Sequence, residues 1–372
     1  MKFSVSSSEL LKQLQVAGGA ISNNPVLPIL EDFLFKIQNN ILTIIATDME
    51  STIVKRIDVT SDENGSIAVP GKILLDTLKA LPQQPITFSI NPETKAIEIT
   101  SAYGKYKLSG EDGDDFPDIS HPDFEDDIKF SSEILLNGIN HTLFATSNDE
   151  LRLAMNGVFF KVEKNNLTLV ATDAHKLVKC SFSNVESKNR ASFILPKKSL
   201  NLLKSALSAD EPVQMMVNET NAFFSFNNTT LICRLIDARY PDYNAVIPLN
   251  NPNLLVVPRQ DFLSSLKRIS IYAGKAFNKV TLSLVDSSLT LSSKDLDFSN
   301  EAIEQMPCEY TGDPMDIAFN VKFLIEMLSV LDCKEVQLKL ATSTRAGILV
   351  PGEQDESEDT LMLLMPVMLE TY

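Results

Sequence analysis

The chain has 372 residues, of which 44% are hydrophobic, and its formal net charge at pH 7 is −16. This composition excludes a disordered chain, and the length predicts two or three domains. The acidic excess, taken alone, argues against nucleic-acid binding, because DNA-binding proteins usually carry a basic excess. No apolar stretch approaches the roughly 18 residues that a membrane span needs, so no membrane contact is expected.

The cysteine pattern and the first residues of the chain favour a cytoplasmic protein. The four cysteines are scattered and form no CxxC pair, which is typical of reduced thiols. The first fifteen residues carry no basic segment followed by an apolar run, so we expect no signal peptide.

One sequence pattern occurs three times. Residues 42–48 read LTIIATD, residues 167–173 read LTLVATD, and a weaker copy, LTLSSKD, covers 289–295. A second marker precedes an apolar helical stretch in each copy and has the same spacing. Its three occurrences are 69–72, 195–198 and 319–322. Two markers with one period of about 124 residues predict three tandem domains.

The predicted domains are 1–120, 128–245 and 246–372. An aromatic residue followed by Pro and Asp occurs at both boundaries, at 116–118 and 240–242. We therefore expect the domains to follow one another with the same geometry. Identical joints between identical units produce an arc, which either closes into a ring or forms a filament.

Six short amphipathic patterns predict helices, two in each domain. They are 7–17, 71–81, 131–145, 197–207, 259–271 and 321–331. Together these segments carry a net charge of +5, which leaves −21 for the rest of the chain. This segregation predicts that the helices line one surface facing a polyanion, while the acidic remainder faces away. The alternative is that these helices merely have a lysine-rich, solvated face.

Stretches of alternating apolar and polar residues predict antiparallel strands between and after the helices. Asn39-Asn40 and Asn91-Pro92 are turn signals between such strands in the first domain. One helix followed by several strands, twice per domain, gives an α+β fold in which two helices cover one face of antiparallel sheets. The strands expected in the first domain include 42–46, 52–59, 86–90 and 96–100.

A size estimate indicates how many copies a DNA-encircling ring needs. A compact domain of about 124 residues is roughly 35 Å across. Three such units touching in a ring leave a hole of only about 5 Å, whereas six leave a hole of roughly 35 Å. Duplex DNA is on the order of 20 Å across. One chain therefore cannot encircle DNA, and two chains can.

Short motifs along nearly the whole chain resemble those of one known family, the bacterial β sliding clamp, which is the beta subunit and processivity factor of DNA polymerase III. The resemblance implies three topologically similar clamp domains per chain. It also implies a head-to-tail homodimer that closes into a ring, with helices lining the hole. The motifs are 1–5, 27–30, 46–48, 156–157, 171–177, 240–243, 319–321 and 365–367.

The resemblance implies a non-enzymatic protein that encircles double-stranded DNA without reading its sequence. Its expected partners are the polymerase III alpha subunit, the clamp loader, and other polymerases and repair proteins, which bind through short linear motifs. No cofactor and no metal are implied. The partner-binding positions that the resemblance assigns are Thr172, His175, Lys176, Leu177, Pro241, Val246, Thr344, Met365, Pro366, Val367 and Met368.

The resemblance also assigns a DNA-facing surface and a joint between two copies, in which Lys105 and Lys107 would face carboxylates of the other copy. The DNA-contacting positions are Lys12, Lys72, Arg152, Lys197, Lys198 and Lys204. The positions in the dimer interface are Tyr103, Lys105, Tyr106, Leu108, Ile271, Tyr272, Glu301 and Glu304.

The chain departs from the family pattern at several arginine positions. Met368 stands where members usually carry arginine, and 370–372 extend the chain beyond the usual end. Ala245 and Asn24 also stand where arginine is frequent. In family members, the arginine at the position of Asn24 often contacts DNA. We expect a peptide preference that depends less on acidic residues.

Two other classes of function remain open from the residues themselves. An enzyme would have to use Asp48, Asp173 and Asp295, one carboxylate per repeat. Their recurrence in all three copies favours a shared turn or cap, and no nucleotide-binding, zinc-protease or serine-hydrolase motif is present. A scaffold that binds peptides but not DNA is the other alternative, because the total charge is acidic.

Overall fold

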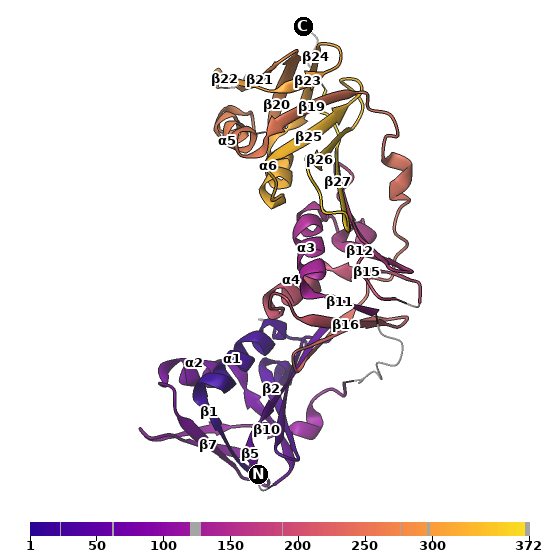
Figure 1. Cartoon of the computed structure of the whole chain (residues 1–372). Helices are drawn as coiled ribbons and strands as arrows, with labels where there is room; N and C mark the ends of the chain where they lie inside the picture. Colours follow the sequence, from indigo (N-terminus) through magenta and orange to yellow (C-terminus); the bar gives the residue numbers. More distant parts are fainter. Residues whose placement is uncertain are drawn as a thin grey trace. The chain divides into compact units, whose positions relative to one another are not determined.

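The computed structural model describes residues 1–22, 24–61, 63–119, 128–187, 189–275, 277–295 and 298–368. Packing divides the chain into two compact units (Figure 1). The first unit contains Met1–Glu133 and Lys198–Leu235, and the second contains Ile134–Lys197 and Ile236–Tyr372. The middle repeat is thus shared between the two units, so this division does not follow the predicted domain ranges.

All six predicted helices are present, which confirms that part of the prediction. Short 3-10 turns at Leu143–Ala145 and Ser270–Tyr272 follow the third and fifth helices, where the predicted segments ran longer. Within the described residues, none of the helices is long and apolar enough to cross a lipid bilayer. The helices are α1 Ser7–Ala17, α2 Gly71–Ala80, α3 Ser132–Thr142, α4 Lys197–Ala206, α5 Arg259–Ile269 and α6 Val321–Val330.

The first unit contains two antiparallel sheets. The smaller sheet has the order β5-β1-β7-β8-β9, with strands Thr60–Ser61, Lys2–Ser6, Pro85–Ile90, Ala96–Thr100 and Lys105–Ser109. The larger sheet has the order β10-β6-β2-β3-β4-β18-β17-β16-β11. Its strands are Glu111–Asp112, Gly65–Pro70, Asp32–Gln38, Ile41–Thr47, Ser51–Asp58, Thr229–Arg234, Asn221–Phe226, Pro212–Val217 and Ile128–Ser131.

Local sequence explains how this unit folds. Asn39 and Asn40 have φ angles of 52° and 63°, which asparagine tolerates well, and they form the predicted turn between β2 and β3. Phe3 and Phe88 from the smaller sheet stack with ring centroids 4.7 Å apart, and both rings pack edge-on against Phe35 of the larger sheet. This fully buried aromatic cluster holds the two sheets together.

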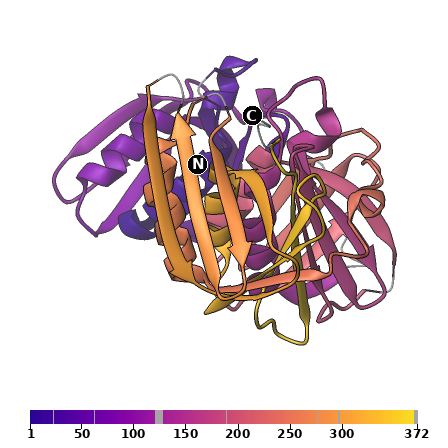
Figure 2. The same ribbon diagram turned by 90° about the horizontal axis from the view of Figure 1, so that it is seen from above.

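The second unit repeats the same plan. Its four-stranded sheet has the order β22-β21-β20-β24, with strands Asn300–Pro307, Ser288–Asp295, Lys279–Val285 and Met315–Asn320. The orange strands of this sheet lie over the neighbouring helices α5 and α6 in Figure 2. The nine-stranded sheet has the order β15-β12-β13-β14-β27-β26-β25-β19-β23. Its strands are Ala191–Pro196, Gly157–Glu163, Asn166–Thr172, Lys176–Phe182, Glu358–Leu364, Gly347–Pro351, Glu335–Leu340, Asn253–Pro258 and Glu309–Thr311.

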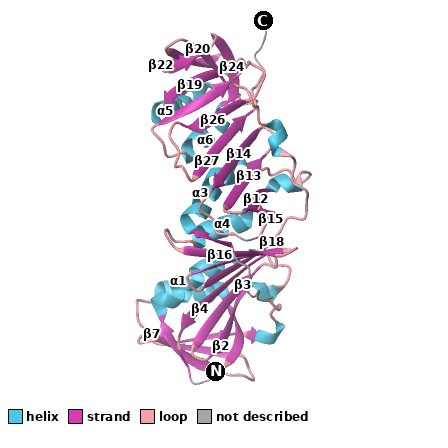
Figure 3. Ribbon diagram, turned by 45° about the vertical axis from the view of Figure 1, so that its right-hand side comes forward, coloured by secondary structure: helices cyan, strands magenta, loops and turns pink. Residues whose placement is uncertain are grey.

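Each nine-stranded sheet contains strands from two neighbouring repeats. In the first unit, β4 pairs with β18 from Ser51↔Cys233 to Lys55↔Thr229; we call this pairing the first joint. In the second unit, β14 pairs with β27 from Lys176↔Leu364 to Phe182↔Glu358; we call this pairing the second joint (Figure 3). Backbone hydrogen bonds therefore fix both joints, and the boundaries between repeats lie inside continuous sheets.

One buried carboxyl group of the first unit is poorly stabilised as an anion. Asp32 begins β2, is only 8% exposed, and lines a cavity of about 480 Å³ beside the start of α2. Burial raises the pKa of Asp32 from its ordinary value of 3.8 to about 6, and the neighbouring carboxylates of Glu111 and Glu31 add to this shift.

We expect Asp32→Asn to stabilise the protein above pH 6 and to leave its stability unchanged below pH 4. The carboxyl ionises near pH 3.8 when unfolded and near pH 6 when folded, so its ionisation destabilises the fold as pH rises between these values. The full shift corresponds to about 1–3 kcal/mol. Thermal unfolding between pH 4 and 7.5 measures it. The exposed Asp118→Asn is the control, and equal gains at both ends of the pH range would contradict the assignment.

Candidate functional site

The tight turn between β13 and β14 organises the candidate site; we call residues 172–177 the second Thr-Asp turn. The Thr172 hydroxyl donates to the Lys176 carbonyl at 2.7 Å and accepts the Ala174 N–H at 3.1 Å. The Asp173 carboxylate accepts the N–H groups of His175 and Lys176, both at 2.9 Å. These bonds hold Ala174 at a φ of 75°, a conformation that non-glycine residues rarely adopt.

The first Thr-Asp turn, residues 47–52, has the same hydrogen bonds. The Thr47 hydroxyl donates to the Ser51 carbonyl, and the Asp48 carboxylate accepts the Ser51 N–H at 2.7 Å. Met49, like Ala174, has a φ of 75°. In the third copy, Asp295 accepts the Phe298 N–H at 3.3 Å. These turn bonds account for the recurring aspartates, as the shared-turn interpretation predicts.

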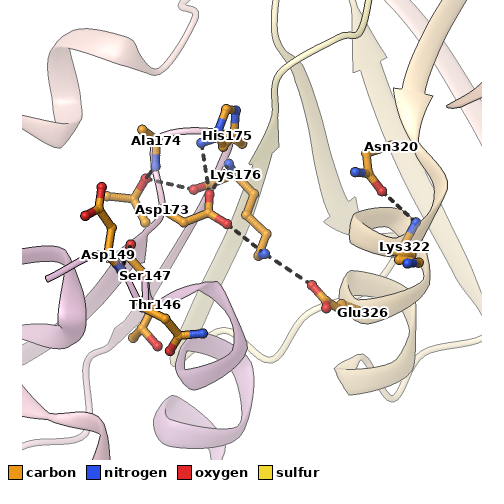
Figure 4. A network of polar contacts seen from close by, with 12 residues as sticks. Thr146, Ser147, Asp149, Asp173, Ala174, His175, Lys176, Asn320, Lys322 and Glu326 are labelled. Atoms are coloured by element: carbon orange, nitrogen blue, oxygen red, sulfur yellow. Dashed lines mark hydrogen bonds and ion pairs between the residues drawn. The ribbon is translucent and has the colours of Figure 1, made fainter. Parts of the chain in front are cut away.

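A buried lysine links the second Thr-Asp turn to α6 (Figure 4). The Lys176 ammonium lies 2.9 Å from the Asp173 carboxylate and 3.2 Å from the Glu326 carboxylate. It also lies 4.0 Å from the centroid of the Phe323 ring, which adds a cation–π contact. Only 5% of the Lys176 side chain is exposed. The turn is therefore fixed to a helix of the third repeat as well as to β27.

An apolar cluster lies beneath the turn. Leu177, Tyr243 and Leu363 are among its buried members. Tyr240 packs at its margin, stacks on Phe159 at 4.7 Å, and donates its hydroxyl to the Val170 carbonyl. The remaining members are Val170, Ala346, Ile247 and Leu361.

The segment that follows β27 is held against this cluster from two sides. The Met365 N–H donates to the His175 carbonyl at 2.9 Å, and the Val367 N–H donates to the Ala318 carbonyl at 2.7 Å. The side chains of Met365 and Met368 are 45% and 85% exposed. Flexible thioether side chains thus reach solvent beside a fixed apolar base.

The structure links the second Thr-Asp turn to the segment after β27, and both contain sequence-predicted partner-binding residues. Leu177 is buried in the apolar cluster, while Val246 is 57% exposed. Lys176 does not face solvent, since its ammonium is ion-paired toward α6. Thr344 lies on an exposed turn. The nearby residue that packs with Leu177 is Ala346. Pro241 is exposed, Pro366 and Val367 are half-buried, Thr172 is nearly buried and His175 is exposed. The extension 370–372 lies outside the described residues.

Sequence reasoning missed several residues of this site. Phe323 and Glu326 stand three positions apart on α6, and Phe323 also faces the His175 ring at 6.5 Å between centroids. The i,i+3 spacing places both side chains on one helix face. That spacing shows a shared face but names no partner, so Lys176 could not be assigned as their neighbour.

The predicted DNA-contacting residues lie on or near helices. Some are exposed, and others have a hydrogen-bond or ion-pair partner within the chain. Lys12, Lys72 and Lys204 are exposed on α1, α2 and α4. Lys198 pairs with Asp48 of the first Thr-Asp turn, and the ammonium of Lys197 donates to the side chain of Asn148 at 3.0 Å. Arg152 lies on an exposed turn with its guanidinium 3.4 Å from Asp149.

The predicted interface residues lie at two sheet edges. Tyr103, Lys105, Tyr106 and Leu108 lie on or just before β9, where Lys105 pairs with Glu98 at 2.8 Å. Ile271 and Tyr272 follow α5 and are 77% and 43% exposed. Glu301 is exposed on β22, whereas Glu304 accepts hydrogen bonds from Arg268, and this lowers the pKa of Glu304.

Comparison with known proteins identifies the family. Models of the N-terminal, central and C-terminal domains of the DNA polymerase III beta subunit match 1–120, 129–242 and 244–366. The chain belongs to the beta sliding clamp family. It is a DNA sliding clamp of the DNA polymerase III type, a class of processivity factors without catalytic activity of their own.

The similarity covers nearly the whole clamp. The beta sliding clamp of Haemophilus influenzae is 30% identical over 98% of this chain and all of its own length. The crystal structure of the Bacillus subtilis clamp superimposes with a TM-score of 0.94 at 25% identity and covers both chains completely. The Pseudomonas aeruginosa clamp, solved with griselimycin bound, gives a TM-score of 0.93 at 26% identity, over 99% of this chain and all of its own.

We expect Lys176→Met to lower the free energy of unfolding of this clamp by about 2–4 kcal/mol, because it leaves the Asp173 carboxylate, only 16% exposed, without its cation. Glu326→Gln should cost less than about 1 kcal/mol, since 44% of the Glu326 side chain is exposed and the amide can still accept a hydrogen bond from Lys176. Denaturant unfolding followed by near-UV signal measures both.

The matched control is Lys179→Met on the same strand, where the pair with Asp359 is more exposed. Its cost should stay below about 1 kcal/mol. Equal decreases in the free energy of unfolding for Lys176→Met and Lys179→Met would show that the buried network stabilises the fold no more than an exposed ion pair does.

Proposed function

We propose that two copies of this clamp close head to tail into a ring around duplex DNA, and that the site beside the second Thr-Asp turn tethers other proteins through short peptides. In this proposal the ranges 1–120, 128–245 and 246–372 of the two copies together form the six repeating units of the ring. The protein itself catalyses no reaction. It acts in the cytoplasm, where it keeps the replicative polymerase and repair proteins on DNA.

Two free sheet edges carry the proposal. In the described part of the chain, β9 and β22 each end a sheet, and no strand pairs with their outer sides. β9 presents Lys105 and Lys107, whereas β22 presents Glu301 and Glu304. Unpaired edge strands invite pairing with another chain, and opposite charges favour these two for each other.

The repeat supplies the register of this third joint. In each repeat, one residue pairs across the hairpin with the residue that precedes the repeat aspartate. These equivalent residues are Thr52, Leu177 and Glu301. At the two intrachain joints, Thr52 pairs with Ile232, and Leu177 pairs with Leu363. Ile232 and Leu363 each pair, on the side away from the joint, with a strand of their own repeat, at residues 223 and 348. Lys107 pairs in the same way with residue 98, and the three positions 98, 223 and 348 are spaced by 125 residues.

The equivalent pair at the third joint is therefore Glu301 of one copy opposite Lys107 of the other. A heterologous contact of this kind closes a ring when the rotation between units is right, and the size estimate requires six units for DNA. Tyr103, Ile271 and Tyr272 supply exposed apolar surface at the same edges.

DNA binding is supported by the lysines on the helices. Lys12, Lys72 and Lys204 are exposed there, while the acidic excess lies outside the helices. A protein that slides must contact phosphates rather than base edges, so binding should be weak, sequence-independent and strongly salt-dependent. Asn24, in place of a frequent arginine, removes one such contact.

Partner binding is supported by the apolar cluster and the exposed apolar side chains around it. Leu177 supplies a buried wall, and Val246, Met365 and Met368 supply exposed apolar side chains that suit varied peptides. The griselimycin-bound relatives support a ligand-binding surface on clamps of this family. Met368, in place of arginine, should reduce the dependence on acidic peptide residues.

Retention on DNA tests the encircling function. After loading by a clamp loader, the protein should stay on nicked circular DNA through gel filtration and should be lost once the circle is cut. A ring is held by topology, so cutting the DNA releases it without changing any contact. A peptide-binding scaffold would be retained on neither form, and equal retention on both would indicate ordinary binding.

Charge reversal tests the third joint. Lys107→Glu and Glu301→Lys should each weaken dimerisation by about tenfold, and the double variant should recover most of the loss, because like charges opposite each other repel. Sedimentation at submicromolar concentration measures the dimer fraction. Lys164→Glu, on an exposed turn, is the control. A double variant no better than the single variants would rule out this register.

Truncation of the two methionines tests the partner site. Met365→Ala with Met368→Ala should weaken binding of a fluorescent polymerase-tail peptide by about 1–3 kcal/mol, because apolar anchors dominate such interfaces. Dimerisation should not change, since the site and the sheet edges are separate surfaces. Leu249→Ala removes a fully exposed apolar side chain outside the cluster and is the control. Unchanged affinity in the double truncation would place the peptide elsewhere.

A further inference from the structure

A cavity of about 630 Å³ opens within the first unit, beside the first joint. Its lining comes from one face of α1, the end of α4, the second half of β4 and the turn between β17 and β18. Lys12, Lys55 and Asn228 are among the residues that line it.

Lys55 is the unusual residue of this cavity. It lies in the middle of β4, with Ile44 on one neighbouring strand and Thr229 on the other, and is only 8% exposed. In the described part of the chain its ammonium has no hydrogen bond and no ion pair. A buried cation without a counter-charge is costly, so its presence calls for a reason.

The two carboxylates that raise the pKa of Lys55, Glu211 and Glu9, form no ion pair with it. Glu9 accepts a hydrogen bond from Gln13 at 2.6 Å, and Glu211 accepts the Ser208 N–H at 2.6 Å. Burial lowers the pKa of Lys55; Glu211 opposes this shift, and the positive charge of Lys12 adds to it. The cavity is thus lined by Lys12, Lys55 and Arg56, and the Lys55 ammonium forms no ion pair with any described carboxylate.

The second joint shows that the fold does not require this lysine. Cys180 lies opposite Thr360 there, just as Lys55 lies opposite Thr229. The Thr360 hydroxyl donates to the Cys180 sulfur at 3.4 Å. A cysteine therefore occupies the strand position equivalent to Lys55, and its thiol has a partner in its own chain.

We propose that the cavity beside the first joint is a binding site for one phosphate group, held by the Lys55 ammonium with Lys12 at its side. The phosphate would come either from the backbone of the encircled DNA or from free phosphate in solution. The first source rests on the proposed function, and the second does not. Glu9 and Asp58 also line the cavity and limit it to a single phosphate group, because a second anionic group inside it would be repelled.

Inorganic phosphate is the direct probe. In calorimetric titrations with ionic strength held constant by sodium chloride, phosphate should bind the unaltered protein, and Lys55→Met should weaken binding by about tenfold or more. Lys55→Arg should retain much of the affinity. Lys36→Met, on an exposed position of β2, should change nothing.

Linear duplex DNA, which can thread through a closed ring, separates the two sources. If backbone phosphate fills the site, Lys55→Met should reduce the slope of log affinity against log salt by about one unit. Loss of phosphate binding with an unchanged slope would assign the site to free phosphate. If the unaltered protein fails to bind DNA, the proposed function fails, while the phosphate titration still decides this inference.

A second variant protects the test from a folding defect. Ser205→Trp fills the cavity from an exposed position at the end of α4 and leaves Lys55 in place. It should abolish phosphate binding as Lys55→Met does. Phosphate affinity and DNA salt slope that are both unaffected by the two variants would overturn the proposal.

Discussion

Backbone pairing across the joints is the interaction on which the rest of this structure depends. β4 with β18 and β14 with β27 turn neighbouring repeats into continuous sheets, so a joint is fixed by the same hydrogen bonds as a strand inside a domain. Side chains then add to each joint in different ways. The first joint has the Asp48–Lys198 pair, and the second has the Asp173–Lys176–Glu326 network.

This arrangement also explains why repeats and compact units differ. The sequence repeat has a period of about 124 residues, whereas packing follows the sheets, and each nine-stranded sheet contains strands of two repeats. The middle repeat contributes to both sheets and is therefore shared between the two units. The predicted domain ranges describe the repeat and say nothing about which parts pack together.

The helices, the Asn39-Asn40 turn and the role of the repeat aspartates could be predicted, because local pattern and turn chemistry determine them. Leu177 could be placed by resemblance. The burial of Lys176 against Phe323 could not, since it depends on a contact between residues 147 positions apart. Lys55 reads as an ordinary strand lysine in the sequence, and only the cavity beside it shows that its charge is unmatched.

The free outer sides of β9 and β22 have a consequence for amide exchange with solvent. Among the described residues of a single chain, no strand bonds to the amide protons on those sides, so they should exchange rapidly with deuterium in an isolated copy. Protons between β14 and β27 lie inside a sheet and exchange only when that sheet splits. Protons on the outer sides of β9 and β22 would report whether a ring has closed, and protons between β14 and β27 would report whether each chain is intact. One exchange measurement gives both, without any attached label.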